Sequence, residues 1–229
     1  MNGTNIFYIL EPPYSDEPHT IYGRSDWEQE FGRASWVHGQ VKMETLRCPV
    51  YPGHQRAGRR IGNLSIALPS EKISDFVWTW YSDCLITDKV LRVFHDAGLS
   101  GFTVSPVEVK PETEDGMNIH NLPVLWELVV TGQGGNAHPQ SGIHLICECP
   151  HCKMKVYSSF KNGIIVDEHS WDGSDFFTVT GYPNFRLVTE RVKDLIVEHG
   201  LTNCALVPSQ NLVWKVLTRP EDEPNNPCE

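Results

Sequence analysis

The sequence predicts an α+β protein made of two similar halves, each with antiparallel strands and one capped helix. Residues 85–107 align without a gap with residues 187–209, at a shift of 102 positions. Upstream, a Cys-Pro pair occurs at Cys48 and again at Cys149, and a Ser-Asp-Phe triplet precedes each helix. A repeat near 100 residues is too long for a solenoid unit, so it indicates an internal duplication of a small α+β unit.

The repeated stretch predicts a helix, a stop and a strand. Thr87 and Thr189 stand at the N-cap position, where a hydroxyl can accept a hydrogen bond from the first helical turn. Apolar side chains then recur at helical spacing. Gly98 and Gly200 follow where a helix ends in a left-handed residue, a conformation that glycine adopts at low cost. A short apolar run follows each glycine and ends at a proline, a pattern that predicts a strand.

The order of these motifs divides the chain. We expect an N-terminal half at residues 1–110 with the first cysteine corner, and a C-terminal half at 111–218 with the second. Residues 108–115 are polar and contain proline, which predicts a linker. Residues 219–229 are rich in proline, asparagine and acids, which predicts a disordered tail. The two halves are expected to pack as one globular unit.

Outside the repeated stretch, short apolar runs predict further strands. These runs are residues 6–10, 35–43, 124–131, 143–147 and 212–217. Asn162-Gly163, between the apolar runs 156–160 and 164–166, predicts a hairpin turn. Residues 52–62 hold the local basic cluster and read as a solvated loop rather than an anion site. The basic side chains of this cluster are His54, Arg56, Arg59 and Arg60.

Composition limits the classes of function. The chain has 229 residues and a net charge of −10, which disfavours a general nucleic-acid binder because phosphates require a basic surface. An acidic surface suits a basic protein partner, or serves solubility alone. The sequence has no secretory signal and no apolar run that would span a membrane. Seven cysteines, an odd number without a signal, favour the reducing cytoplasm over a disulfide framework.

The cysteine corners suggest a zinc site. Cys149 and Cys152 form a CxxC at the end of a predicted strand, a spacing that lets two thiolates bind one zinc ion. The first corner retains Cys48, but Tyr51 stands where its second cysteine would be. Three ligands are therefore expected from these cysteines, and the alternative is a corner that has lost its metal.

The fourth ligand is left open by the sequence. The candidates near the corners are Cys147, His54 and His151. Cys147 and Cys149 lie two apart in a predicted strand and so face the same side, which favours Cys147.

No catalytic constellation emerges from the sequence, so we expect a protein that is not an enzyme. The usual hydrolase, metalloprotease, phosphate-loop and dinucleotide motifs are missing. A redox role for the CxxC would require it to begin a helix. The conspicuous titratable groups that remain are His95, His199, Asp167, Glu168, His169 and Asp172.

An aromatic run suggests a contact surface. Trp78, Trp80 and Tyr81 lie within eight residues, at 74–81. Such side chains belong to a core by default, and the alternative is that they anchor a protein partner, because aromatic residues are enriched at binding hot spots.

The layout resembles the double-CXXCG motif proteins. The resemblance runs to about Pro208 and is clearest over 175–208, with the Val-Thr-Glu-Arg helix start and the Gly-Leu helix end. It implies zinc ligands at Cys48, Cys149 and Cys152. In this chain, Pro52 and Lys153 replace the glycine that trails each corner.

The resemblance also implies a function. It suggests an immunity protein of a bacterial polymorphic toxin system, which would bind a cognate toxin in the cytosol and occlude its active site. The acidic charge would suit a basic, nuclease-type toxin. The alternatives are a thiol- or zinc-dependent enzyme and a zinc-stapled adaptor for another protein.

Overall fold

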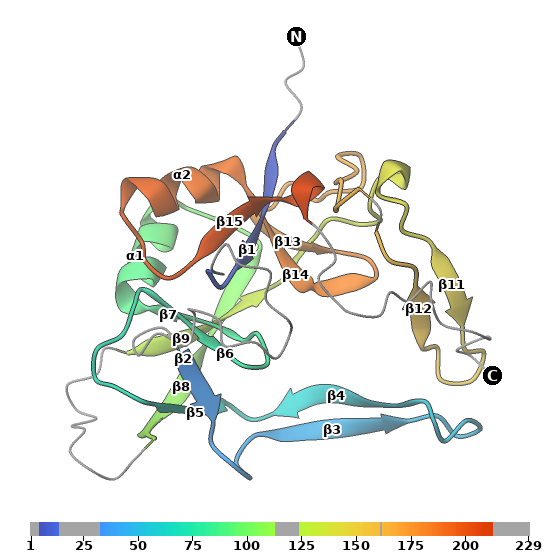
Figure 1. The fold of residues 1–229 in the computed structure, drawn as a ribbon, viewed down its shortest axis with the longest axis horizontal. Coiled ribbons are helices and arrows are strands. Elements are labelled where there is room, and N and C mark those ends of the chain that lie inside the picture. The colour runs from blue at the N-terminus through green and yellow to red at the C-terminus, as the bar shows by residue number, and fades with distance from the viewer. Residues whose placement is uncertain (1–4, 14–32, 113–123, 161, 213–229) are drawn as a thin grey trace.

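A closed barrel of six strands forms one part of the structure (Figure 1). The structure, a computed structural model, describes residues 5–13, 33–112, 124–160 and 162–212. In order around the barrel, the strands are β2 (Arg33–Trp36), β5 (Leu64–Leu68), β8 (Phe102–Pro111), β9 (Leu125–Val130), β7 (Cys84–Thr87) and β6 (Phe76–Thr79). Four of the six contacts are antiparallel, whereas β2 with β6 and β5 with β8 are parallel.

A sheet of five strands lies beside the barrel, and two helices cover one side (Figure 1). The strands, in order, are β10 (Gly132–Gln133), β13 (Phe176–Val179), β14 (Tyr182–Thr189), β1 (Phe7–Glu11) and β15 (Ala205–Pro208). The helices are α1 (Asp88–Asp96) and α2 (Glu190–Glu198), and short 3₁₀ turns occur at η3 (Pro139–Ser141) and η4 (Ser209–Asn211). The predicted α+β class is confirmed, although the expectation of purely antiparallel strands is wrong, because β10 with β13 is also parallel.

Two hairpins extend from this body, and we call them the arms. The first arm is β3 (Lys42–Arg47) with β4 (Gln55–Ile61), and the second is β11 (Leu145–Glu148) with β12 (Lys155–Tyr157). Within the described residues, each of these strands pairs only with the other strand of its arm. The far ends of both arms meet at the lower right in Figure 1.

Both helices end as the sequence predicts, but they begin differently. Gly98 and Gly200 have φ angles of +63° and +55°, in the left-handed region where only glycine is unstrained. Thr87 and Thr189 do occupy the N-cap positions, yet neither hydroxyl caps its helix. The Thr189 hydroxyl instead donates to Asp175 at 3.0 Å. At α2 a tertiary contact has therefore replaced the local capping bond, whereas the buried hydroxyl of Thr87 makes no hydrogen bond within the described part of the chain.

A single apolar cluster joins barrel, sheet and helices. Phe76, Phe94 and Phe176 are fully buried within it, and they come from β6, α1 and β13. The ring centres of Phe94 and Phe176 lie 5.3 Å apart with the ring planes tilted by 52°, within the range of separations that aromatic pairs favour. The helices contribute Val90 and Val192, both fully buried. Segments about 100 residues apart thus share one core.

Two aspartates link the helix ends reciprocally. Asp75 accepts hydrogen bonds from the backbone N–H and the hydroxyl of Thr202, at 2.9 and 3.0 Å. Asp175 accepts the matching pair from Ser100, at 2.9 and 3.2 Å. Each aspartate therefore holds the loop that follows the other helix. Two further residues complete the pattern, since Lys89 pairs with Asp75 and Arg191 with Asp175.

Three local predictions from the sequence are corrected. Residues 55–61, expected as loop, form β4 because β3 offers them a partner. The expected hairpin at Asn162-Gly163 does not form: β12 pairs with β11, and Val166 bridges Ala137. The expected linker is partly strand, since β8 runs to Pro111 beside β5. The predicted tail at 219–229 and most of the predicted strand at 212–217 lie outside the described residues.

We expect Asp175→Ala to lower the free energy of unfolding by roughly 1.5–3 kcal/mol, the range for hydrogen bonds to a charged group. The substitution leaves the Ser100 and Thr189 donors without their acceptor. Denaturant unfolding monitored by circular dichroism measures the change. Asp96→Ala, at an exposed position of α1, is the control and should shift stability by less than about 0.5 kcal/mol. Equal effects of the two substitutions would contradict the role of Asp175.

Candidate metal centre

The turn of the first arm places Cys48 and His54 side by side. The backbone N–H of Cys48 donates to the His54 carbonyl at 3.3 Å, and the N–H of His54 donates to the Tyr51 carbonyl at 3.0 Å. These bonds close the turn between β3 and β4. Cys48 and His54 are both 7% exposed, so their side chains point away from solvent.

The turn of the second arm has the same kind of closure. The N–H of Cys149 donates to the Met154 carbonyl at 2.8 Å, and the N–H of Lys153 donates back to the Cys149 carbonyl at 3.0 Å. Lys153 has a φ of +58°, which turns the chain sharply after Cys152. Cys149 is fully buried, and Cys152 is partly exposed.

Four potential ligands converge where the two turns meet. The ligand atoms of Cys48, His54, Cys149 and Cys152 all lie within 4.8 Å of one another. The Cys48 and Cys149 sulfurs are 4.0 Å apart, and the Cys152 sulfur is 3.9 Å from Nδ1 of His54. Each arm supplies two of the four.

The donor set fits a metal ion. Zinc binds thiolates at about 2.3 Å in tetrahedral geometry, so two ligating sulfurs lie about 3.8 Å apart. The observed 4.0 Å between Cys48 and Cys149 is close to this value and far from the roughly 2.05 Å of a disulfide. Three sulfurs and one imidazole nitrogen are a recurring structural zinc set. The residues present can therefore hold a metal ion, and the soft sulfur ligands favour zinc.

Neighbouring donors favour thiolates in the cluster. The Arg56 guanidinium donates to the Cys152 sulfur at 3.7 Å and to its carbonyl at 3.3 Å. The N–H of Tyr51 donates to the Cys48 sulfur at 3.3 Å. The pKa of Cys152 falls to about 6, chiefly through the backbone N–H of Met154 and also through Arg56 and His54. Cys152 is thus a thiolate at neutral pH.

Cys147, expected as the fourth ligand, is not in the cluster. It lies on β11 opposite Val156 and is disulfide-bonded, so its sulfur is not a free thiolate. The expectation of reduced cysteines is therefore wrong for Cys147. His151, another candidate, is exposed, with its ring 5.8 Å from that of Tyr51. His54 takes the fourth place because β4 folds back on β3. The only sequence signal for this was its position six residues after Cys48.

The aromatic run is divided between core and surface. Trp78 is fully buried, and its indole N–H donates to the Asn203 carbonyl at 2.8 Å. Trp78 therefore belongs to the core, which was the default interpretation, and the alternative of a partner contact is wrong for this residue. Trp80 and Tyr81 are 56% and 64% exposed in the turn after β6. The Tyr81 ring packs on Trp36 at 3.9 Å between ring centres.

A cleft of about 320 Å³ opens beside Tyr81, between β9 and the β13–β14 hairpin. Arg186 lines it, donates to the Ser82 carbonyl and lies over the Trp78 ring. Glu127 also lines the cleft, although its carboxylate pairs with Arg60 from the first arm. The cleft is small, Glu127 is ion-paired and Arg186 is occupied by the Ser82 carbonyl and the Trp78 ring, so the cleft offers less chemistry than the cysteine cluster.

Comparison of the chain with models of known protein families and with curated proteins gives no match. The function is therefore argued from the site and from the resemblance of the sequence layout. Among the described residues, no helix has the length and apolar character needed to cross a bilayer.

Among the cysteines that the structure describes, we expect Cys152 to be the most reactive in the metal-free protein. Its alkylation by iodoacetamide should rise with a midpoint near pH 6, because the thiolate is the reacting form. Burial raises the pKa of both Cys84 and Cys204 to about 12, so these thiols should stay unreacted at pH 8. Mass spectrometry of alkylated peptides measures each site. Equal labelling of Cys84 and Cys152 at pH 7 would contradict the assignment.

We also expect Arg56→Gln to speed loss of zinc to a chelator by about 10-fold or more, the scale seen when an outer-shell partner is removed. Three thiolates and a neutral imidazole leave the zinc site with one negative charge, which the Arg56 guanidinium offsets. A colorimetric chelator measures the rate. Arg59→Gln on the same strand is the control, because Arg59 pairs with Glu44 away from the cysteines. Identical rates for the two variants would argue against the role of Arg56.

Proposed function

We propose that the chain binds one zinc ion through Cys48, His54, Cys149 and Cys152, and that this ion is structural. The convergence of four ligands, two from each arm, carries the proposal. Structural zinc sites have four protein ligands, whereas catalytic sites keep one position open for water or substrate. A closed site at the tips of two hairpins would fasten the arms together.

We propose further that this zinc-fastened protein is an immunity protein of a bacterial toxin system, acting in the cytosol. It would bind its cognate toxin domain and occlude the active site without chemistry of its own. Three features support this: the resemblance to double-CXXCG proteins, a cluster of four potential ligands that would leave a bound metal no open position, and exposed aromatic side chains at Trp80 and Tyr81. The net charge of −10 suits a toxin that is basic overall, such as a nuclease-type domain.

We infer that the two halves arose by duplication of one unit. The order of hairpin, strand pair, helix and strand occurs twice, and Asp75 and Asp175 make matching contacts across the two copies. The same origin accounts for the metal site. Each copy supplies one cysteine corner, and the zinc lies between them.

The thiol of Cys152 favours one alternative function, a thiol-dependent enzyme. The partly exposed thiol of Cys152, with its pKa near 6, has the character of a reactive cysteine when no metal is bound. A thiol-dependent enzyme would use this form. In the adaptor alternative, the protein would still bind zinc, but its partner would be a protein other than a toxin.

The proposed function is tested first by metal content and then by protection. We expect about one zinc per chain by elemental analysis, and Cys149→Ser should abolish it. Cys84→Ser, a buried thiol outside the cluster, should keep the zinc.

A host that expresses the toxin domain encoded by the neighbouring gene should stop growing. Co-expression of this protein should then restore its growth. If the neighbouring product is harmless, the immunity function is wrong. Zinc binding without protection would favour the adaptor. Activity that requires the metal-free Cys152 would favour the enzyme.

A further inference from the structure

The arms expose an unusual share of apolar surface. Twelve large hydrophobic side chains are exposed among the described residues, and six of them belong to the arms or their turns. These six are Met43, Leu46, Val50, Ile61, Leu145 and Ile146. Clustered exposed apolar side chains mark interaction sites in soluble proteins.

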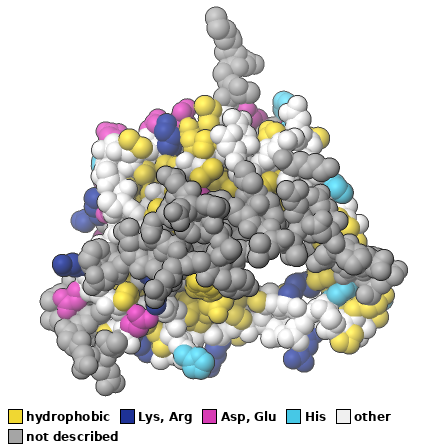
Figure 2. Space-filling model, in the orientation of Figure 1, with side chains coloured by type: hydrophobic (Ala, Val, Ile, Leu, Met, Phe, Trp, Pro, Cys, Tyr) yellow, Lys and Arg dark blue, Asp and Glu magenta, His cyan; other side chains and the backbone are white. Residues whose placement is uncertain are grey.

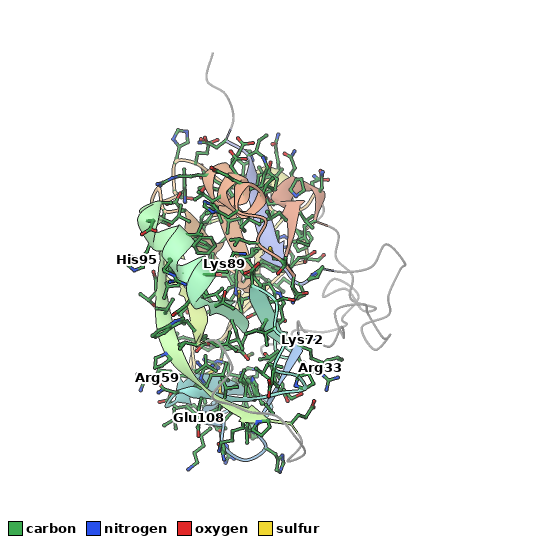
Figure 3. All side chains as sticks on the ribbon, turned by 90° about the vertical axis from the view of Figure 1, so that its left-hand side faces the viewer. Arg33, Arg59, Lys72, Lys89, His95 and Glu108 are labelled. Carbon is green, nitrogen blue, oxygen red and sulfur yellow. The ribbon has the colours of Figure 1, made fainter. Side chains whose placement is uncertain are left out.

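The arms also differ in charge from the rest of the molecule. Residues 42–61 and 145–157 contain seven Lys or Arg and two Glu, a net charge of +5, so the rest of the chain carries −15. Five of these cations are exposed: Lys42, Arg47, Arg59, Lys153 and Lys155. Three of them pair with the two glutamates of the arms, Arg59 with Glu44 and both lysines of the second arm with Glu148. In Figure 2, hydrophobic and basic side chains lie next to one another at the lower right, over the arms. Figure 3 shows Arg59 low on the molecule, well away from His95 on α1.

The first arm is held at both ends. At its base, Arg60 pairs with Glu127 on β9 and with Asp83, whose carboxylate also accepts the indole N–H of Trp36 at 2.6 Å. At its tip, Cys48 and His54 join the second arm in the metal cluster. An arm fixed at both ends loses little conformational freedom when it binds, which favours affinity.

We propose that the two arms form the surface that contacts the toxin, and that the toxin face they meet is acidic with an apolar centre. This proposal rests on the immunity function proposed above and adds the contact surface to it. The exposed apolar side chains supply the buried centre of the interface, and the five exposed cations supply its rim. Zinc serves this surface by holding the arms in one geometry.

A nuclease-type toxin would attract both the acidic body and the basic arms of this protein. Such a domain has a basic surface for nucleic acid, to which the acidic body of this protein would be attracted from a distance. Its catalytic centre is acidic, because carboxylates hold the catalytic metal ions. Basic arms laid over that centre would block access of nucleic acid to it.

The test measures the affinity between this protein, loaded with zinc, and the purified toxin domain of the neighbouring gene made inactive by substitution. Leu46→Ser with Ile61→Ser should weaken binding at least about 10-fold, as loss of interface hot spots does. Lys42→Glu with Arg47→Glu should slow association. The control variants are Val197→Ser, exposed on α2, and Arg92→Glu, exposed on α1. They should bind as the natural protein does.

The outcomes separate the two proposals. If the natural protein binds and the arm variants, still loaded with zinc, bind equally well, the toxin uses another surface and the arm proposal is overturned. If the natural protein does not bind, the immunity function fails and the arm proposal with it. Sedimentation of the protein alone checks for a second copy. A dimer that the Leu46 and Ile61 substitutions dissolve, with toxin binding unchanged, would assign the arms to self-association instead.

Discussion

The shared apolar cluster around Phe76, Phe94 and Phe176 is the interaction on which the other features of this protein depend. It buries side chains from the barrel, the sheet and both helices, and burial of apolar surface is the main favourable term in folding. The contacts of Asp75 and Asp175 make the packing specific. Each carboxylate accepts two hydrogen bonds from one loop and so fixes the position of that loop. Together they set one half of the chain against the other.

The metal cluster follows from this packing. Cys48 and Cys149 are 101 residues apart in sequence, yet their sulfurs lie 4.0 Å apart because the body orients both arms toward one point. The arms themselves contribute little core, since most of their side chains are exposed. Hairpins of two strands are only marginally stable alone, so a metal ion bound at their tips would supply the stability that packing does not.

Stability and recognition are thus assigned to different parts of the molecule. The body carries the packed aromatic residues, including Trp78, whereas the arms carry exposed apolar and basic side chains. A surface that is rigid yet poorly packed is suited to binding, because it still has apolar area to bury against a partner. In the proposed function, a zinc ion would link the two roles, because it would fix the arms and leave their outer faces available.

The sequence by itself determined the α+β class, both helices with their glycine ends, and three of the four clustered ligands. The helices are local features, set by helical spacing and by left-handed glycines, and Cys149 and Cys152 are joined by the short reach of a CxxC turn. Cys48 was indicated by the second occurrence of the Cys-Pro pair. The closure of the barrel, the burial of Trp78 and the choice of His54 over Cys147 were decided only by the tertiary structure. Each depends on which strand becomes a neighbour: β4 folds back on β3 and brings His54 to Cys48, and no local pattern specifies that pairing.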